Sequence, residues 1–223
     1  MSKIIGFIGS CPADICMYAA YAMQNTGSSV CVIDNSMEGV LYGCVPKADA
    51  QAMAVTFHQV DFLRFKPFIQ WHELEYTYVF ILLGDRPQEL CMASCCMCVL
   101  VVDCERRNLD FYRRFMKESS MAMHVVLRGF CAGSVFVKKV MERFSDQNGL
   151  VVRWMLVPLD ERDEAYRIGM QYGKIGKFPD ISLAMEKALA QILALLGAGS
   201  PVGVMQAVKN AEKGKNSAYR ILG

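Results

Sequence analysis

The sequence predicts an α/β protein with a doubly wound, mostly parallel sheet and helices on both faces. Short apolar runs, such as residues 78–83, alternate with segments whose apolar residues recur at helical spacing. Hydrophobic residues make up 53% of the 223 residues and charged residues only 21%, which is enough apolar material to cover both faces of a sheet. We therefore expect one α/β domain at residues 1–196.

The first strand is expected at residues 3–8. A helix follows directly, because Pro12 suits a first helical turn, Ser10 or Cys11 can cap it, and Asn25-Thr26-Gly27 ends it. A short helix holding the cysteine group at residues 91–98 is expected before the fourth strand. The remaining predicted elements are strands at 30–33, 78–83, 99–102, 124–127 and 151–156, and helices at 109–117, 134–144 and 182–196.

Two stretches depart from this alternation. Residues 37–75 are too apolar for a disordered linker, so we expect an ordered insertion at the ligand-side edge of the sheet, with a partner surface as the alternative use of its aromatic residues. These are Phe57, Phe62, Phe65, Phe68 and Trp71. Residues 197–223 begin with a Gly- and Ser-containing break and predict a flexible basic tail. A helix docked on a partner is the alternative, because Val204, Val208 and Ala211 recur at helical spacing. Its basic residues are Lys209, Lys213, Lys215 and Arg220.

Charge and hydropathy restrict the function classes. The formal net charge is +2 and the sequence shows no basic face, so we expect no nucleic-acid binding, because affinity for DNA depends largely on phosphate neutralisation. No apolar run approaches the roughly 18 residues needed to span a bilayer, and no signal peptide is recognised. We expect a cytoplasmic protein.

Cysteine and histidine do not form a recognisable site. The ten cysteines lie in apolar surroundings and are expected to be reduced core residues. The densest group, Cys91, Cys95, Cys96 and Cys98, has neither zinc nor iron–sulfur spacing, and a cysteine-ligated metal protein stays a minor alternative. The three histidines show no triad or ligand spacing. We expect no catalytic and no metal-binding residues.

Ligands of doubly wound sheets bind at the carboxyl ends of the strands. These ends, at residues 9–11, 34–36, 84–85 and 128–130, are predicted to meet along one rim. We take eight rim residues as the candidate binding residues or dimer face, and they are Gly9, Ser10, Cys11, Pro12, Asp34, Ser36, Gly84 and Asp85.

Several segments resemble, in order, the MinD/ParA-like (SIMIBI) P-loop ATPases. KIIGFIG at 3–9, YAAYAM at 18–23 and GSSVCVIDNS at 27–36 resemble the opening of that family, YTYVFILLG at 76–84 resembles its third strand, and VVLRGF at 125–130 resembles its VLNRF strand end. The similarity extends over the whole domain and implies a P-loop NTPase-like fold. LG at 83–84 and YGKIG at 172–176 are most similar to the TadZ/CpaE group, which positions pilus secretion machinery.

The resemblance also identifies residues that this chain lacks. The family's phosphate-binding lysine corresponds to Pro12, which offers neither a cation nor an N–H, and the loop is shorter. The acidic residue after the second strand corresponds to Ser36, although Asp34 remains, and the third-strand carboxylate corresponds to Leu82. Asp14 could favour the dipole of its helix, and Asp85 could belong to a turn. A role of either residue as a relocated magnesium ligand is the alternative. Four lysines are candidates to replace the missing phosphate-binding lysine, and they are Lys3, Lys47, Lys174 and Lys177.

The function that this resemblance implies is a non-hydrolysing pseudo-ATPase, acting as a scaffold or localisation factor and not as an enzyme, with no ATP or magnesium as cofactor. Family members dimerise across their nucleotide sites, so the expected partners are proteins, in a homodimer or in a heterodimer with a related ATPase. MinD also uses a C-terminal amphipathic helix at membranes, which implies a weak peripheral contact with the inner membrane face through residues 202–223. The alternative is an ATP-binding switch with slow hydrolysis that drives dimerisation.

Overall fold

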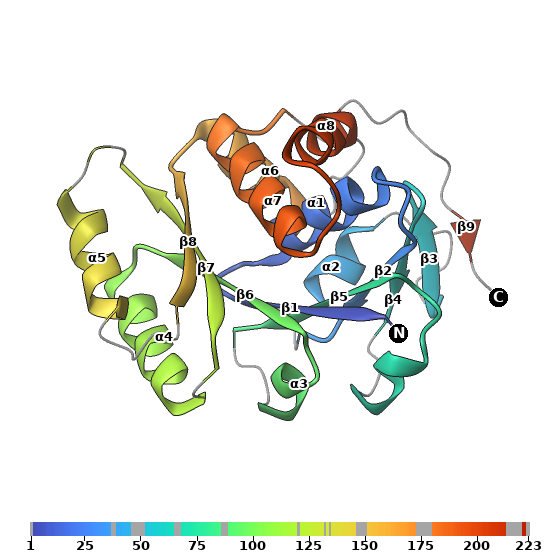
Figure 1. Ribbon diagram of the computed structural model, residues 1–223, viewed down its shortest axis with the longest axis horizontal. Helices are drawn as coiled ribbons and strands as arrows, with labels where there is room; N and C mark the ends of the chain where they lie inside the picture. Colours follow the sequence, from blue (N-terminus) through green and yellow to red (C-terminus); the bar gives the residue numbers. More distant parts are fainter. Residues whose placement is uncertain are drawn as a thin grey trace.

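Figure 1 shows the protein as a computed structural model, which describes residues 2–36, 39–45, 52–64, 68–85, 89–119, 121–131, 133, 135–145, 151–172, 180–212 and 220–221. Within these residues the strands form one nine-stranded sheet of order β8-β7-β6-β1-β5-β2-β4-β3-β9. All strands from β1 to β8 except β3 run parallel. The strands are β1 (Lys3–Gly9), β2 (Val30–Asp34), β3 (Ala54–Phe57), β4 (Val60–Leu63), β5 (Tyr78–Gly84), β6 (Met97–Asp103), β7 (Met123–Phe130), β8 (Val151–Pro158) and β9 (Arg220–Ile221).

Helices cover both faces of this sheet, which confirms the predicted fold class (Figure 1). Side chains of β1 alternate between the two layers: Ile5 and Phe7 join one core cluster, and Ile4 and Ile8 join the other. The first layer contains α1 (Ala13–Gln24), α2 (Val40–Cys44), α6 (Glu161–Gln171), α7 (Leu183–Leu195) and α8 (Pro201–Glu212). The second contains the 3-10 helix η1 (Phe68–Glu73), α3 (Glu89–Ala93), α4 (Arg106–Ser119) and α5 (Val135–Ser145).

The described part of residues 37–75 extends the sheet. β4 adds to β2 in parallel, and β3 returns beside β4 in antiparallel orientation. Phe57, Phe62 and Trp71 are buried, so these aromatic residues form core and not a partner surface. Phe65 and the side chain of Phe68 lie outside the part that the structure describes.

Residues 201–212 form a helix, α8, in agreement with their helical spacing and in place of the predicted flexible tail. α8 packs on α1 and α7 of the same chain. The buried face of α8 is made of small apolar residues, which let the helix approach closely. They are Val204, Ala207, Val208 and Ala211. Since this face is already covered, it is not available for the membrane contact expected of residues 202–223. Lys213 and Lys215 lie outside the described residues.

All ten cysteines are free, but only five of them are buried, and Cys11, Cys96 and Cys131 are exposed, so the expectation that all are core residues is wrong. The expected helix holding the cysteine group is also only partly correct, because α3 contains Cys91 whereas Cys98 lies in β6. Among the described residues, no group of three or more His, Cys, Asp or Glu side chains could hold a metal ion. No described helix combines the length and the apolar character needed to cross a membrane.

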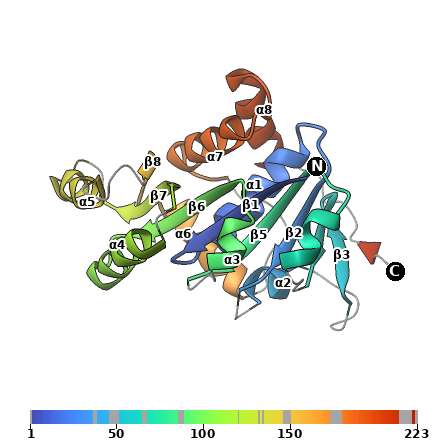
Figure 2. The same ribbon diagram turned by 60° about the horizontal axis from the view of Figure 1, so that its bottom comes forward.

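Positive charge is concentrated on one pair of helices, so the expectation that no basic face exists is wrong. α4 and α5 lie side by side at one end of the molecule in both views (Figures 1 and 2). Their exposed basic residues outnumber their acidic ones although the whole chain carries only +2. These basic residues are Arg106, Arg107, Arg113, Arg114 and Lys117 on α4, and Lys138, Lys139 and Arg143 on α5.

Two histidines predict how stability depends on pH. Burial lowers the pKa of His58 below its usual 6.5, and burial together with the nearby Arg153 lowers the pKa of His124. Below about pH 6.5 the unfolded chain therefore binds more protons at these sites than the folded protein. We expect the free energy of unfolding to decrease as the pH falls from 7 to 5, measured by urea titration. In a His58→Gln/His124→Gln variant this slope should flatten, and an unchanged slope would contradict the assignment.

Candidate functional site

The loop between β1 and α1 lies at the centre of the carboxyl edge of the sheet, since β1 is flanked by β5 and β6. Gly9 has a φ of +118°, and a Cβ atom there would lie 1.9 Å from the carbonyl oxygen of Val101. That same oxygen accepts a hydrogen bond from the Ser10 N–H at 2.8 Å. The start of the loop therefore packs tightly against β6, and the Ser10 N–H is already hydrogen-bonded within the protein.

The rest of the loop is also tied to neighbouring elements. The Ser10 side chain lies near the Tyr112 hydroxyl of α4. Burial raises the pKa of that hydroxyl to about 12, and Ser10 opposes this shift. Cys11 is exposed with a φ of +50°. Pro12 occupies the N-cap position of α1 with no side-chain cap, so the expected capping by Ser10 or Cys11 is wrong. Pro12 has no N–H, and the loop therefore offers few free donors at this point.

Asp34 at the end of β2 is buried, and its own loop occupies its oxygens. Oδ1 accepts hydrogen bonds from the Ser36 N–H at 3.1 Å and from the Ser36 hydroxyl at 2.5 Å. Oδ2 accepts the Tyr42 N–H at 2.9 Å, which links β2 to α2. Gly84, with a φ of +74°, faces Ser36, because a Cβ there would lie 3.3 Å from the Ser36 Cβ. Asp34, Ser36 and Gly84 thus lie together, as their positions at strand ends predict.

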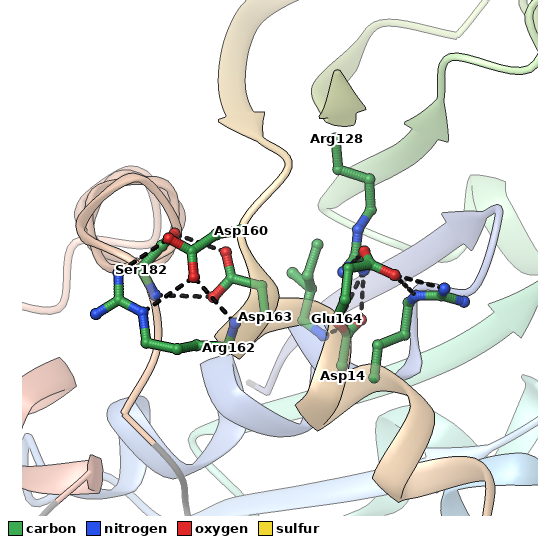
Figure 3. Close-up of polar contacts among 9 residues, drawn as sticks. Asp14, Arg128, Asp160, Arg162, Asp163, Glu164 and Ser182 are labelled. Atoms are coloured by element: carbon green, nitrogen blue, oxygen red, sulfur yellow. Dashed lines mark hydrogen bonds and ion pairs between the residues drawn. The ribbon is translucent and has the colours of Figure 1, made fainter. Parts of the chain in front are cut away.

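Asp14 and Arg128 form a buried ion pair behind the loop (Figure 3). The Arg128 Nη1 donates to both carboxylate oxygens of Asp14, at 2.9 and 2.8 Å. The exposed fractions are 2% for Asp14 and 3% for Arg128. Asp14 also accepts the Ile15 N–H at 2.9 Å, so its carboxylate both stabilises the start of α1 and neutralises the buried guanidinium.

A β-bulge places Arg128 in this position. The pairing of β7 with β8 shifts between Arg128 and Phe130, and the intervening Gly129 has a φ of +71°. Bulges bend a strand and redirect its side chains. Burial opposes the charge of Arg128, but attraction to Asp14 and Glu164 outweighs it, and the pKa of the guanidinium is raised.

The pair continues into α6 as a network. Arg128 Nη2 lies 3.6 Å from Glu164 Oε1, and Glu164 Oε2 accepts from Arg167 Nη2 at 2.6 Å. Asp163 holds the same helix to the start of α7, accepting the Ser182 N–H at 2.8 Å and the Ser182 hydroxyl at 2.6 Å. Burial raises the pKa of Asp163, although both Ser182 hydrogen bonds oppose the shift. Charged side chains from β7, α1 and α6 therefore meet behind the loop.

Sequence reasoning placed Arg128 among the strand ends that meet along the rim but gave it no partner. It did not identify Glu164 or Arg167, and it missed α6 entirely. A signal for the helix exists: Asp160 caps its N-terminus by accepting the Arg162 N–H, and three acidic residues follow in the first turn. No comparable local signal in the sequence indicates the ion pair of Arg128, because its partner Asp14 is 114 positions away.

The described residues do not fit a magnesium-bound triphosphate by the P-loop pattern, which needs free loop N–H groups, a lysine and oxygen ligands for the metal. The loop contains no basic residue between Gly9 and Asp14. Leu82 on β5 is buried and offers no carboxylate, and Asp85 is exposed. Lys3 donates to the Leu196 carbonyl, away from the loop at the opposite end of β1. Lys47, Lys174 and Lys177 lie outside the described residues.

The parallel sheet, wound in both directions from β1, and the strand–loop–helix unit at its centre define a P-loop NTPase-like α/β domain. Solved structures of MinD and ParA ATPases share this fold. MinD of Aquifex aeolicus matches with a TM-score of 0.60 and 13% identity over 90% of this chain and 99% of that one. It also matches in its complex with MinC, with a TM-score of 0.52 and 11% identity over 99% of both chains.

Two ParA proteins show the same likeness. A ParA family ATPase from Chlorobium tepidum TLS matches with a TM-score of 0.58 and 12% identity over 95% of this chain and 99% of that one. The pNOB8 ParA bound to nonspecific DNA matches with a TM-score of 0.54 and 10% identity over 94% and 99%. No family model and no curated protein matches the sequence. At these identities the likeness shows the MinD/ParA fold, and function needs its own argument.

Proposed function

We propose that this protein is a non-hydrolysing relative of the MinD and ParA ATPases that works as a scaffold or localisation factor through protein contacts. The observation that carries this proposal is the buried Asp14–Arg128 pair at the start of α1. In a P-loop protein the start of this helix faces the phosphates. Here a carboxylate and its own cation already satisfy one another at that position.

The electrostatics of the pair argue against a bound triphosphate. A phosphate entering beside Asp14 would meet a buried negative charge, and Arg128 could turn to it only by leaving Asp14 unpaired. Removing one partner of a buried ion pair costs about 3–5 kcal/mol, because the other charge is left buried without compensation. The changes at Pro12, Ser36 and Leu82 remove phosphate and metal ligands independently of this pair. Together they support a fold kept for binding and not for hydrolysis.

The rim around Cys11 is the surface that we propose for self-association. Gly9 is unsuitable as a probe, since its side chain would collide with Val101. Cys11 is exposed, and Cys96, also exposed, precedes β6 at the opposite end of the sheet and provides a matched control. We expect Cys11→Glu to weaken a dimer by at least about tenfold in sedimentation equilibrium, from charge introduced into a desolvated interface. Cys96→Glu should leave it unchanged.

Nucleotide dependence separates this proposal from its rival. The scaffold should associate equally with and without magnesium and ATP. An ATP-binding switch should instead dimerise only when nucleotide is added. Equal effects of Cys11→Glu and Cys96→Glu, or a monomer at all concentrations, would contradict the rim as the dimer face.

The process served is a further part of the proposal. The TadZ/CpaE resemblance favours pilus or secretion assembly, although the residues 173–176 that contribute to it lie outside the described part. The expected location is the cytoplasm. Loss of surface pili in cells lacking the protein, with restoration by the intact chain, is the result we expect. Normal pili in such cells would contradict this assignment.

A further inference from the structure

α4 and α5 lie side by side on the layer opposite α1 (Figure 2). Side chains of both helices line a groove between them. On α4 its walls are formed by Arg106, Leu109, Asp110 and Arg113, which follow one another at i, i+3, i+4 and i+7. On α5 the lining likewise recurs at helical spacing, from Phe136 to Phe144. One continuous stripe of each helix therefore faces the groove.

The groove combines an apolar floor with basic side chains along its edges. Leu109, Val140 and Phe144 are buried at its base, whereas Phe136 is 44% exposed. Four cations and one carboxylate line it, and the carboxylate, Asp110, lies 3.7 Å from the Arg106 Nε. The remaining three cations have no ion pair among the described residues, and they are Arg113, Lys139 and Arg143. The net positive charge of the groove lining therefore exceeds the net charge of +2 of the whole chain.

We propose that this groove binds an acidic amphipathic helix of a partner protein. Apolar side chains of that helix would fill the floor, and its flanking carboxylates would pair with the three free cations. The volume of about 260 Å³ suits a few inserted side chains and is smaller than the roughly 300–1,000 Å³ of sites that enclose a whole small molecule.

Two other anionic surfaces fit the groove less well. Duplex DNA gains affinity from phosphate contacts and gains nothing from an apolar floor. An anionic bilayer contacts residues that protrude, whereas Leu109 and Val140 lie buried at the base of a concavity. The inference goes beyond the proposed scaffold function, because the groove contains no residue of the rim and its test does not depend on dimerisation.

The test uses the full chain and a fluorescein-labelled synthetic helix of about five turns, with leucine along one face and glutamate beside it. Fluorescence anisotropy should show saturable binding to the wild-type protein. Arg113→Glu/Arg143→Glu should weaken it by at least about tenfold, through loss of two ion pairs and the added repulsion. Arg114→Glu/Lys117→Glu makes the same charge change on α4 outside the groove lining and should leave the affinity within about twofold. Phe136→Ser should also weaken binding.

Several outcomes would overturn the proposal. These are failure of the glutamate peptide to bind, equal binding of a peptide with lysine in place of glutamate, and equal losses in the two charge-reversal variants. Binding that is insensitive to Phe136→Ser would show surface attraction alone. Stronger, groove-dependent binding of a DNA duplex or of phosphatidylglycerol vesicles than of the peptide would assign the surface to nucleic acid or to membrane.

Discussion

Replacing Arg128 with alanine should lower the free energy of unfolding by about 3–5 kcal/mol, because it leaves the Asp14 carboxylate buried without its cation. Asp14 and Arg128 are almost fully buried, and the two hydrogen bonds between them are 2.9 and 2.8 Å long. A loss of this size is a large part of the roughly 5–15 kcal/mol that stabilises an ordinary domain. Urea denaturation followed by circular dichroism gives the value directly.

Two control variants make this result specific. Arg162→Ala breaks the exposed pair with Asp160 and should have a much smaller effect, since solvent screens that pair. Asp14→Leu/Arg128→Met removes both charges together and should recover much of the stability lost in Arg128→Ala, because no unpaired charge stays buried. If Arg128→Ala cost no more than Arg162→Ala, the pair would not hold the site as described.

Gly9→Ala is the second change with a large expected effect, about 3 kcal/mol of destabilisation from backbone strain and steric overlap. The new methyl group would lie 1.9 Å from the Val101 carbonyl oxygen, which is backbone and cannot move aside without separating β1 from β6. The measurement is the shift of the urea midpoint at constant slope.

Gly199→Ala is the matched control for Gly9→Ala. Gly199 has a φ of +130°, close to that of Gly9, but no described atom lies within 4 Å of the position that its new methyl group would take. It therefore reports the cost of the backbone conformation alone. Gly9→Ala should be the more destabilising of the two by the cost of the collision. Equal losses would show that the loop does not press against β6.

The central strands could be predicted from the sequence because each is a short, mostly apolar run between turn residues. β1, β5 and β6 are buried on both faces, and a parallel sheet covered by helices demands this pattern. β3 and β4 were not predicted as strands, since each is only four residues long and the surrounding segment is irregular. The docking of α8 was not predicted, because its apolar face consists of small alanine and valine side chains, which give a weak signal in the sequence. In the structure these small side chains allow α8 to pack closely on α1.

The candidate site was predictable only in its local part. The positions of Gly9, Asp34 and Gly84 follow from the rule that parallel strands end along one rim. The Asp14–Arg128 pair does not follow, because a long-range ion pair leaves no spacing signal in one sequence. The network with Glu164 was inaccessible for the same reason, and it depends on a helix that sequence reasoning missed. The local sequence thus indicated that the loop lacks phosphate-binding residues. The tertiary structure shows that the Asp14–Arg128 pair lies at this position.

Calorimetric titration of ATP with magnesium into the purified protein tests the central claim most directly, paired with a thermal shift at millimolar nucleotide. We predict no heat of binding and no shift, because the Asp14–Arg128 pair and the Ser10–Val101 hydrogen bond already occupy the groups that a phosphate would need. Binding at micromolar concentration would instead stabilise the protein by up to about 4 kcal/mol at a thousandfold excess over the dissociation constant. That result would contradict the scaffold account and favour an ATP-dependent switch.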